Sequence, residues 1–216
     1  MILNEIKKRF YTSLALFFIV FLIVKSNFFL LYLLIVFGVL SLLEFFNIII
    51  KLFKKKYLRL LLNLLFIIFI TSFCFLFFYF SNIYQLKIIL FTLLFGCIAS
   101  DIGGLVIGKI FKGPKLTKIS PNKTISGALG SLLFSIIIVN FLFFHFFKVL
   151  NIDVLFVSIC TSLGCQIGDL FFSFLKRKVK IKDTGNILPG HGGVIDRLDG
   201  IFLGLPIGFI SLIIFF

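Results

Sequence analysis

The chain has 216 residues, of which 61% are hydrophobic and only 14% are charged, and Phe alone contributes 34. An ordinary soluble domain is about 45–50% apolar and about 25% charged. A soluble fold of this size could not bury so much apolar surface, so the composition excludes a disordered chain, a disulfide scaffold and an ordinary cytosolic enzyme. Lipid is therefore expected to be the solvent for most of the chain.

Apolar runs long enough to cross a bilayer follow one another along the sequence. A helix needs about 20 residues to cross the hydrocarbon core, and the runs lack the alternation of a membrane β-barrel. The fold class is therefore predicted to be an all-α polytopic membrane protein with about seven transmembrane helices. The predicted spans are 10–24, which is short, 28–50, 60–80, 86–108, 125–147, 154–175 and 198–216, which contains Pro206.

Basic residues gather in alternate gaps between these spans. If the N-terminus is cytoplasmic, 19 Lys or Arg fall on the cytoplasmic side, within 7–9, 51–59, 109–123 and 176–197, against Lys25, Lys87 and Lys148 on the other side. This asymmetry sets the orientation of membrane proteins. It also explains the net charge of +14 without a nucleic-acid partner.

Acidic residues are few, and most of them fall in the second half of the chain. An ionised carboxylate in the middle of a span costs about 2.5–3.5 kcal/mol on insertion scales, so it usually faces a cavity and has a partner. Glu5, Glu44 and Asp153 look incidental, although Glu44 lies unexplained inside the second span. The others are candidates for function: Asp101, Asp169, Asp183, Asp196 and Asp199.

Polar and small residues recur at helical spacing in three spans. Steps of three or four place a polar set on one face of 154–175 and its flanks, with the order Ser158, Ser162, Gln166, Asp169, Ser173, Lys176. Two interpretations stay open for the serines, namely a functional seam and hydrogen bonding between helices. Small residues at every fourth position favour close helix packing, at Gly96, Ser100, Gly104 and Gly108 and at Gly200, Gly204 and Gly208.

Two cytoplasmic loops are rich in groups that hold phosphate. The run Ser120-Pro121-Asn122-Lys123-Thr124 precedes a span, where amides of a helix N-terminus attract anions. The stretch 176–199 holds six Lys or Arg, His191 and four glycines before Asp196. Together with the carboxylates, this concentration suggests a phosphate ester held partly by a divalent cation.

The segment from Ser173 to Asp199 resembles the signature of the phosphatidate cytidylyltransferases, or CDP-diacylglycerol synthases. That signature reads S-x-Φ-K-R-x4-K-D-x-G-x2-Φ-P-x-H-G-G-Φ-x-D-R-Φ-D, with Φ apolar, and every specified position matches over 27 residues. Ser100-Asp101-Ile-Gly-Gly and Ser120-Pro121-x-Lys123-Thr124 resemble two further blocks of the family. The similarity covers about residues 96–204, and it divides the chain into an N-terminal transmembrane region, 1–90, and a catalytic transmembrane region, 91–216.

The chain departs from the family pattern at three positions. It has Ser126 where an acidic residue is usual, Phe172 where Glu is usual, and Leu105 where an aromatic is frequent. These differences bear on fine substrate contacts and leave the signature segment intact.

The resemblance implies that CTP and phosphatidic acid react to give CDP-diacylglycerol and pyrophosphate, a step of phospholipid biosynthesis. It implies a homodimer in a bacterial inner membrane, with the active site on the cytoplasmic side, and Mg²⁺ as the cofactor, a second cation being an open alternative. By resemblance, Asp169 and Asp196 are metal ligands. Catalytic roles are implied for Lys176, Arg177, Asp183, His191, Arg197 and Asp199, and substrate-binding roles for Asp101, Ser120, Lys123, Thr124, Ser173 and Lys182.

Two other functions remain as alternatives. A CTP-dependent lipid kinase shares the need for CTP and a membrane substrate, but it should lack a complete match to the signature. A transporter or lipid translocator should carry polar residues in both halves of its spans and weak inverted repeats. The polar residues of this chain crowd toward the cytoplasmic side, which disfavours transport.

Overall fold

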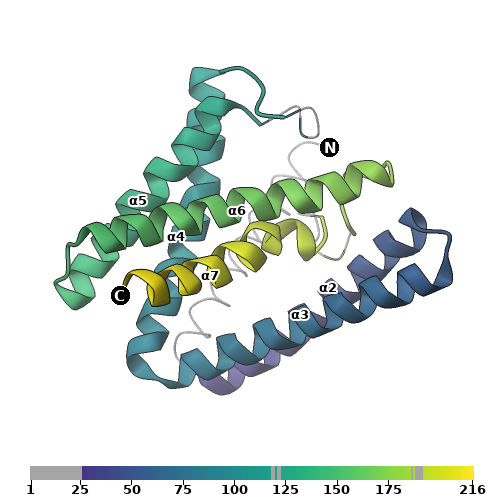
Figure 1. Ribbon diagram of the computed structural model, residues 1–216, viewed down its shortest axis with the longest axis horizontal. Coiled ribbons are helices and arrows are strands. Elements are labelled where there is room, and N and C mark those ends of the chain that lie inside the picture. Colours follow the sequence, from purple (N-terminus) through teal and green to yellow (C-terminus); the bar gives the residue numbers. More distant parts are fainter. Residues whose placement is uncertain (1–25, 118–119, 121–122, 186, 188–191) are drawn as a thin grey trace, which may run out of the picture. The chain divides into compact units, whose positions relative to one another are not determined.

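The computed structural model describes residues 26–117, 120, 123–185, 187 and 192–216. Within these residues the chain forms six α-helices (Figure 1). The predicted first span, 10–24, lies outside the described residues, as does His191. The helices are α2 (Asn27–Leu52), α3 (Lys56–Asn82), α4 (Tyr84–Phe111), α5 (Ile125–Phe147), α6 (Ile152–Lys178) and α7 (Ile195–Phe215).

Each of these helices is long and apolar enough to cross a membrane, and each overlaps one predicted span. The prediction of an all-α polytopic membrane protein is therefore confirmed. The helices extend beyond the apolar runs at several ends; α7, for example, begins at Ile195 rather than at 198. Hydropathy marks the part in hydrocarbon, whereas a helix continues for as long as its backbone groups find partners. As a result, Asp196 and Arg197 belong to the first turn of α7.

The chain divides into two compact units. The first combines the described part of Met1–Asn82 with Leu175–Arg197, and the second combines Ile83–Phe174 with Leu198–Phe216. The boundary falls near the end of α6 and near the start of α7, so the signature segment belongs mostly to the first unit. The predicted division into an N-terminal region, 1–90, and a catalytic region, 91–216, concerns function rather than compactness, and it stays a prediction.

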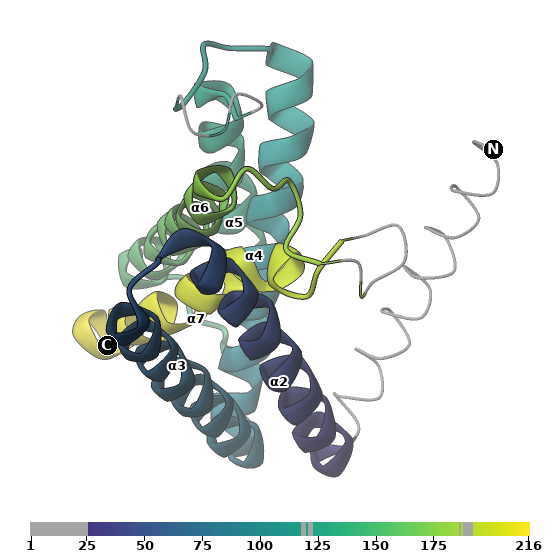
Figure 2. The ribbon, with the colours of Figure 1, turned by 90° about the vertical axis from the view of Figure 1, so that its right-hand side faces the viewer.

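Helices α2 and α3 form a hairpin in the first unit (Figure 2). The guanidinium of Arg59 closes the turn by donating to the carbonyl oxygens of Phe53 and Lys54, at 2.7 and 2.8 Å. The rings of Phe45 and Phe66 stack between the helices with centroids 3.8 Å apart. The hairpin therefore holds α2 by contacts that do not involve the signature segment.

Glycines set the helix spacing in the second unit. A Cβ on Gly127 of α5 would lie 2.9 Å from the carbonyl oxygen of Gly104 on α4, closer than real Cβ atoms approach. A Cβ on Gly164 of α6 would lie 3.0 Å from the Cα of Gly204 on α7. The packing interpretation of the two glycine rows is thus confirmed, because backbones meet where side chains are missing.

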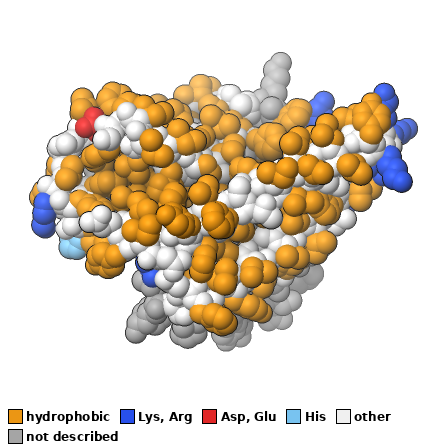
Figure 3. All heavy atoms as spheres, turned by 60° about the horizontal axis from the view of Figure 1, so that its bottom comes forward, with side chains coloured by type: hydrophobic (Ala, Val, Ile, Leu, Met, Phe, Trp, Pro, Cys, Tyr) orange, Lys and Arg blue, Asp and Glu red, His pale blue; other side chains and the backbone are white. Residues whose placement is uncertain are grey.

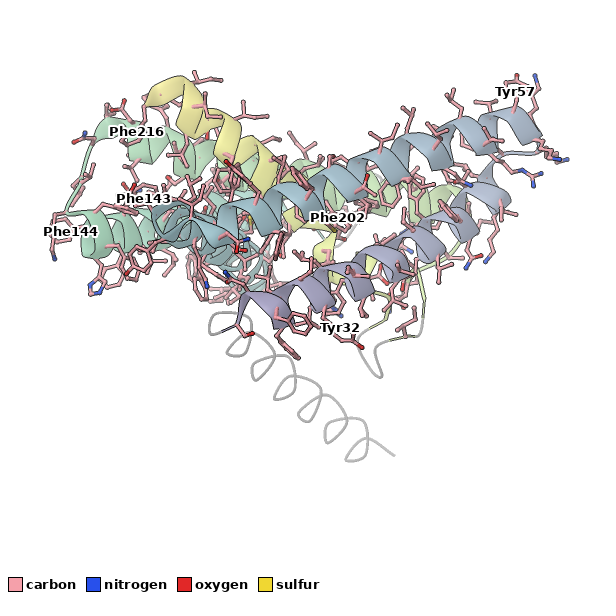
Figure 4. All side chains as sticks on the ribbon, turned by 90° about the horizontal axis from the view of Figure 1, so that it is seen from below. Tyr32, Tyr57, Phe143, Phe144, Phe202 and Phe216 are labelled. Atoms are coloured by element: carbon pink, nitrogen blue, oxygen red, sulfur yellow. The ribbon has the colours of Figure 1, made fainter. Side chains whose placement is uncertain are left out.

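Large apolar side chains cover the outside of the helices. Hydrophobic atoms fill most of the face in Figure 3. The neighbours Phe143 and Phe144 illustrate the two environments, since the former is 4% exposed and packs in a core with Val139 and Val154, whereas the latter is 47% exposed (Figure 4). An outer surface of this kind is what a lipid solvent requires.

The α4–α5 contact predicts a measurable effect of one methyl group. Gly130→Ala would place a Cβ 2.7 Å from the carbonyl oxygen of Gly103, so we expect overpacking of about 1–3 kcal/mol. The result should be a lower temperature at which the detergent-purified protein loses its monodisperse size-exclusion peak. Gly38→Ala is the matched control, because its Cβ meets only side-chain atoms of Ile70 and Cys74 at 3.4 Å. Equal thermal stability of the two variants would contradict the packing argument.

Candidate functional site

Asp196 lies at the centre of a polar cluster in the first unit. Its side chain is 7% exposed and pairs with the ammonium of Lys176, with Nζ 2.7 Å from Oδ1. The other oxygen, Oδ2, accepts the backbone N–H groups of Thr184 at 2.8 Å and Gly193 at 2.9 Å. A buried carboxylate needs such partners, because an unpaired charge removed from water is strongly unfavourable. We call this set, with Glu44, the Asp196 cluster.

Glu44 enters the same cluster from α2. Its side chain is buried, and its two oxygens accept the N–H groups of Val194 at 2.8 Å and Ile195 at 2.9 Å. The Thr184 hydroxyl donates to Oε2 at 2.6 Å. The first N–H groups of a helix have no partner within the helix and favour an anion nearby. Glu44 therefore satisfies the start of α7.

The sequence-based prediction that Glu44 is incidental was wrong. The motifs occupy 96–204, whereas Glu44 contacts residues 140 to 151 positions away, and no pattern in one sequence links such distant positions. One signal was available: an ionisable residue within a span is by default a candidate for function.

Glycines of the signature segment make room for the Glu44 carboxylate. A Cβ on Gly185 would lie 2.9 Å from Glu44 Oε1, and a Cβ on Gly193 would meet both the Thr184 hydroxyl and Glu44. Gly192 has φ = +86°, a conformation that L side chains rarely adopt. These glycines do admit an anion, as their number indicated, but in the described residues that anion is a carboxylate of the chain itself.

Lys123 and Asp169 form a second ion pair, which lies in the second unit. Their side chains are 25% and 33% exposed, so both remain open to a ligand. The Ser173 hydroxyl donates to Asp169 Oδ1 at 3.4 Å, one helical turn away on α6. We call these three residues the Asp169 cluster. All three were predicted from sequence, although their contact with one another was not.

The loop before α5 holds Lys123 in place. An isolated antiparallel bridge joins Lys115 to Thr124, and the N–H of Leu116 donates to the carbonyl of Lys123 at 2.8 Å. The Thr124 hydroxyl caps α5 by accepting the N–H of Gly127 at 3.1 Å. Ser126, where the family has an acidic residue, accepts the N–H of Gly113 at 3.2 Å and so ties the loop together.

The serine row of α6 serves helix packing. Ser158 and Ser162 are fully buried, and the Ser162 hydroxyl lies 2.9 Å from that of Ser100 on α4. Gln166 donates its amide to the carbonyl of Ala128 on α5 at 3.2 Å. The alternative of hydrogen bonding between helices therefore holds for these residues. Phe172, another departure from the family pattern, is buried and packs on Phe202 with ring centroids 6.0 Å apart.

The remaining predicted residues are placed as follows. Asp199 is buried and accepts the N–H of Gly200 at 3.0 Å. The carbonyl of Ser120 accepts the N–H of Lys123 at 3.1 Å. Exposed side chains are those of Asp101, Arg177, Lys182, Asp183 and Arg197, and the third departure, Leu105, is exposed as well. Lys176 is buried, whereas its neighbour Arg177, which is not on the polar face that runs from Ser158 to Lys176, is exposed.

The donor sets bear on metal binding. Within the described residues, no three His, Cys, Asp or Glu side chains gather as a ready metal cage. Asp169 and Asp196 nevertheless offer the carboxylate oxygens that Mg²⁺ prefers, and each already holds a cation in the form of a lysine ammonium. Asp196 Oδ1 has Lys176 as its described partner, whereas Oδ2 is engaged by backbone donors.

Comparison with known proteins decides the family. The Cytidylyltransferase family matches residues 2–215, which is nearly the whole chain and extends well beyond the 96–204 of the motifs. The chain belongs to the cytidylyltransferase family. The N-terminal helices are therefore part of the family likeness as well.

Individual relatives carry one name. Proteins called phosphatidate cytidylyltransferase match from Rickettsia bellii (43% identity over 129 residues, 54% of this chain and 55% of the relative) and Helicobacter pylori strain 26695 (43% over 107 residues, 50% and 40%). A third, from Staphylococcus haemolyticus, is 43% identical over 110 residues, 50% of this chain and 42% of the relative. The chain thus spans about half the length of the curated relatives it matches.

The Lys176–Asp196 pair predicts a contrast between neighbours. Lys176→Met leaves a buried carboxylate without its counter-charge, for which about 3–5 kcal/mol is typical, so thermal stability in detergent should fall. Arg177→Met is the control, because Arg177 is exposed and an exposed substitution changes stability by about 0.5 kcal/mol or less. Adding Asp196→Asn to Lys176→Met should recover part of the loss. Equal stability of the two single variants would show that the pair contributes nothing.

Proposed function

We propose that this chain transfers the cytidylyl group of CTP to phosphatidic acid and releases pyrophosphate. The observation that carries the proposal is the complete signature from Ser173 to Asp199 within a chain that matches the family from residue 2 to 215. The name shared by the relatives supports the same reaction. The membrane helices fit a lipid substrate.

The reaction needs little from a general base. A phosphate oxygen of phosphatidic acid, largely ionised at neutral pH, attacks the α-phosphorus of CTP. The bond from the α-phosphorus to the oxygen that bridges to the β-phosphorus breaks, and pyrophosphate leaves with the electron pair. The main obstacle is the repulsion between two polyanions, so positioned positive charge is the principal contribution of the protein.

The basic residues of the signature segment are proposed to supply that charge. Arg177, Lys182 and Arg197 are exposed and can reach phosphate oxygens from the solvent side. Lys176 is paired with Asp196. If a divalent cation bound Asp196 instead, the Lys176 ammonium could pair with a substrate phosphate. His191 is proposed as a phosphate donor, on the motif alone. The nucleotide side is assigned to Ser120, Lys123 and Thr124, and supporting roles to Asp101, Ser173, Asp183 and Asp199.

A divalent cation, proposed to be Mg²⁺, fits the two carboxylates. We assign it to Asp169, whose carboxylate is one-third exposed, and to Oδ1 of Asp196. The motif, rather than a distance, is the reason to assign both residues to one metal. When bound, the cation neutralises phosphate charge, and the displaced lysines would do the same from the protein side. A second cation remains an open extension of this proposal.

The site is proposed to lie on the cytoplasmic side of a bacterial inner membrane, and the charge asymmetry of the loops supports this orientation. Cysteine labelling tests this: positions 54, 115 and 180 should react from the cytoplasmic face and position 148 from the other. Positions 115 and 180 on opposite faces would exclude a single site. A homodimer is proposed as well, from family resemblance.

Pyrophosphate release tests the reaction. Purified protein in detergent, given CTP, Mg²⁺ and phosphatidic acid, should release pyrophosphate only when all three are present. A CTP-dependent lipid kinase would release CDP instead, and a translocator would leave CTP intact. Either outcome would overturn the proposal.

The carboxylates are tested by removing their charge alone. Asp169→Asn and Asp196→Asn keep side-chain size but weaken metal binding, so each should lose most turnover, and the remaining activity should need more Mg²⁺. Asp153→Asn is a matched control, because Asp153 lies in the first turn of α6, 16 positions before Asp169. Near-wild-type rates with an unchanged Mg²⁺ requirement in both site variants would refute the metal assignment.

A further inference from the structure

A continuous hydrogen-bonded chain connects α2 with Asp196. Thr184 Oγ1 lies 2.6 Å from Glu44 Oε2 and 3.1 Å from Asp196 Oδ2, and Asp196 Oδ1 then meets Lys176. All four residues belong to the first compact unit. Glu44 lies outside the signature motif, on α2, roughly 12 Å along the helix axis before the end of that helix.

The Thr184 hydroxyl has one proton and two carboxylates within reach, so it donates to one of them at a time. The shorter distance, to Glu44, identifies Glu44 as the stronger acceptor. Thr184 also donates its backbone N–H to Asp196 Oδ2 at 2.8 Å. Glu44 therefore holds the hydroxyl of Thr184, and the backbone of the same residue holds Asp196.

Glu44 acts on the other side of Asp196 as well. Its two oxygens accept the N–H groups of Val194 and Ile195, which lie in the sequence between Gly193 and Asp196. Gly193, which donates to Asp196 Oδ2, comes directly before Val194. Two backbone segments donate to Oδ2, one at Thr184 and one at Gly193. The Glu44 carboxylate therefore holds both of them.

We propose that Glu44 is a positioning residue for Asp196. By fixing Thr184 and residues 193–195, it keeps Oδ2 engaged with backbone donors and leaves Oδ1 to a cation, either the Lys176 ammonium or a divalent metal. The described partners of Glu44 are neutral donors, namely one hydroxyl and two backbone N–H groups. This inference rests on the proposed function and deepens it, because it adds a residue of the N-terminal helices to the catalytic segment.

Paired variants separate positioning from simple packing. Glu44→Gln keeps size but offers one acceptor oxygen in place of two, so one of the two backbone N–H groups loses its partner. Thr184→Val removes the hydroxyl at constant shape, and Thr184→Ser restores it. Ser41→Ala is the matched control, since Ser41 is one turn away on α2, is fully buried, and its hydroxyl has no hydrogen-bond partner among the described residues.

Two readouts are measured on full-length protein in detergent. The first is kcat and KM for CTP and phosphatidic acid. The second uses Mg²⁺ alone, without substrates, and records the Mg²⁺ concentration that gives half of the maximal rise in thermal stability. Partners that orient a metal ligand typically change activity or metal affinity about 10–100-fold, so Glu44→Gln should lower kcat and raise the Mg²⁺ midpoint by that order. Thr184→Val should shift both in the same direction, whereas Thr184→Ser and Ser41→Ala should resemble wild type.

Three outcomes would overturn the role of Glu44, and a fourth would overturn the proposed function. If Glu44→Gln only lowers thermal stability, with kcat and the Mg²⁺ midpoint unchanged, Glu44 is a structural residue. If Glu44→Gln does not yield monodisperse protein, Thr184→Val decides, and wild-type values for it would overturn the inference. An absence of any Mg²⁺ effect on the wild type would overturn it as well. A wild-type protein that responds to Mg²⁺ but makes no CDP-diacylglycerol would instead refute the proposed function, while the Mg²⁺ midpoints would still test Glu44.

Discussion

The start of α7 is the constraint on which the candidate site depends. A helix that begins away from water must find acceptors for its first N–H groups, because each unsatisfied group is costly. Here Glu44 accepts the N–H groups of Val194 and Ile195 at the start of the helix, and Asp196 accepts those of Gly193 and Thr184 in the loop before it. The loop that carries the signature is therefore held at two places, at Thr184 and just before α7. The buried Lys176 balances the charge of Asp196.

Glycine has two distinct uses in this chain. In the second unit, Gly103, Gly104, Gly127 and Gly130 let α4 and α5 approach until backbone meets backbone, a device suited to a solvent that provides no hydrophobic drive between helices. In the signature segment, Gly185 and Gly193 admit the Glu44 carboxylate. A substitution in the first group should act through stability. A substitution in the second should act through the geometry around Asp196.

Local and periodic features could be predicted from the sequence. The six described spans follow from hydropathy, and the glycine rows from their spacing, because both depend on neighbours within one helix. The ion pair joins Lys123, just before α5, with Asp169 on α6, and its geometry depends on how these two helices pack. Glu44 was missed because its partners are far along the chain, and the serines of α6 could not be assigned until Ser100 was seen opposite Ser162. Periodicity identifies a face of a helix but not what lies against it.

Both proposed metal ligands are held by lysines, Asp169 by Lys123 and Asp196 by Lys176. Such pairs hold positive charge beside both carboxylates, next to the place where phosphates are proposed to bind. A cation that takes the carboxylates would release that charge to the substrate. The ion pairs of the described structure thus suit a reaction between two polyanions.

The most direct test of cytidylyl transfer follows the phosphorus atoms of CTP. Purified protein is incubated with phosphatidic acid and Mg²⁺, and with CTP labelled in either the α- or the γ-phosphate, and the lipid is then extracted. Transfer of the cytidylyl group predicts that the α-label enters the lipid and that the γ-label leaves in pyrophosphate. The γ-label in the lipid, or no label from either CTP, would contradict the account.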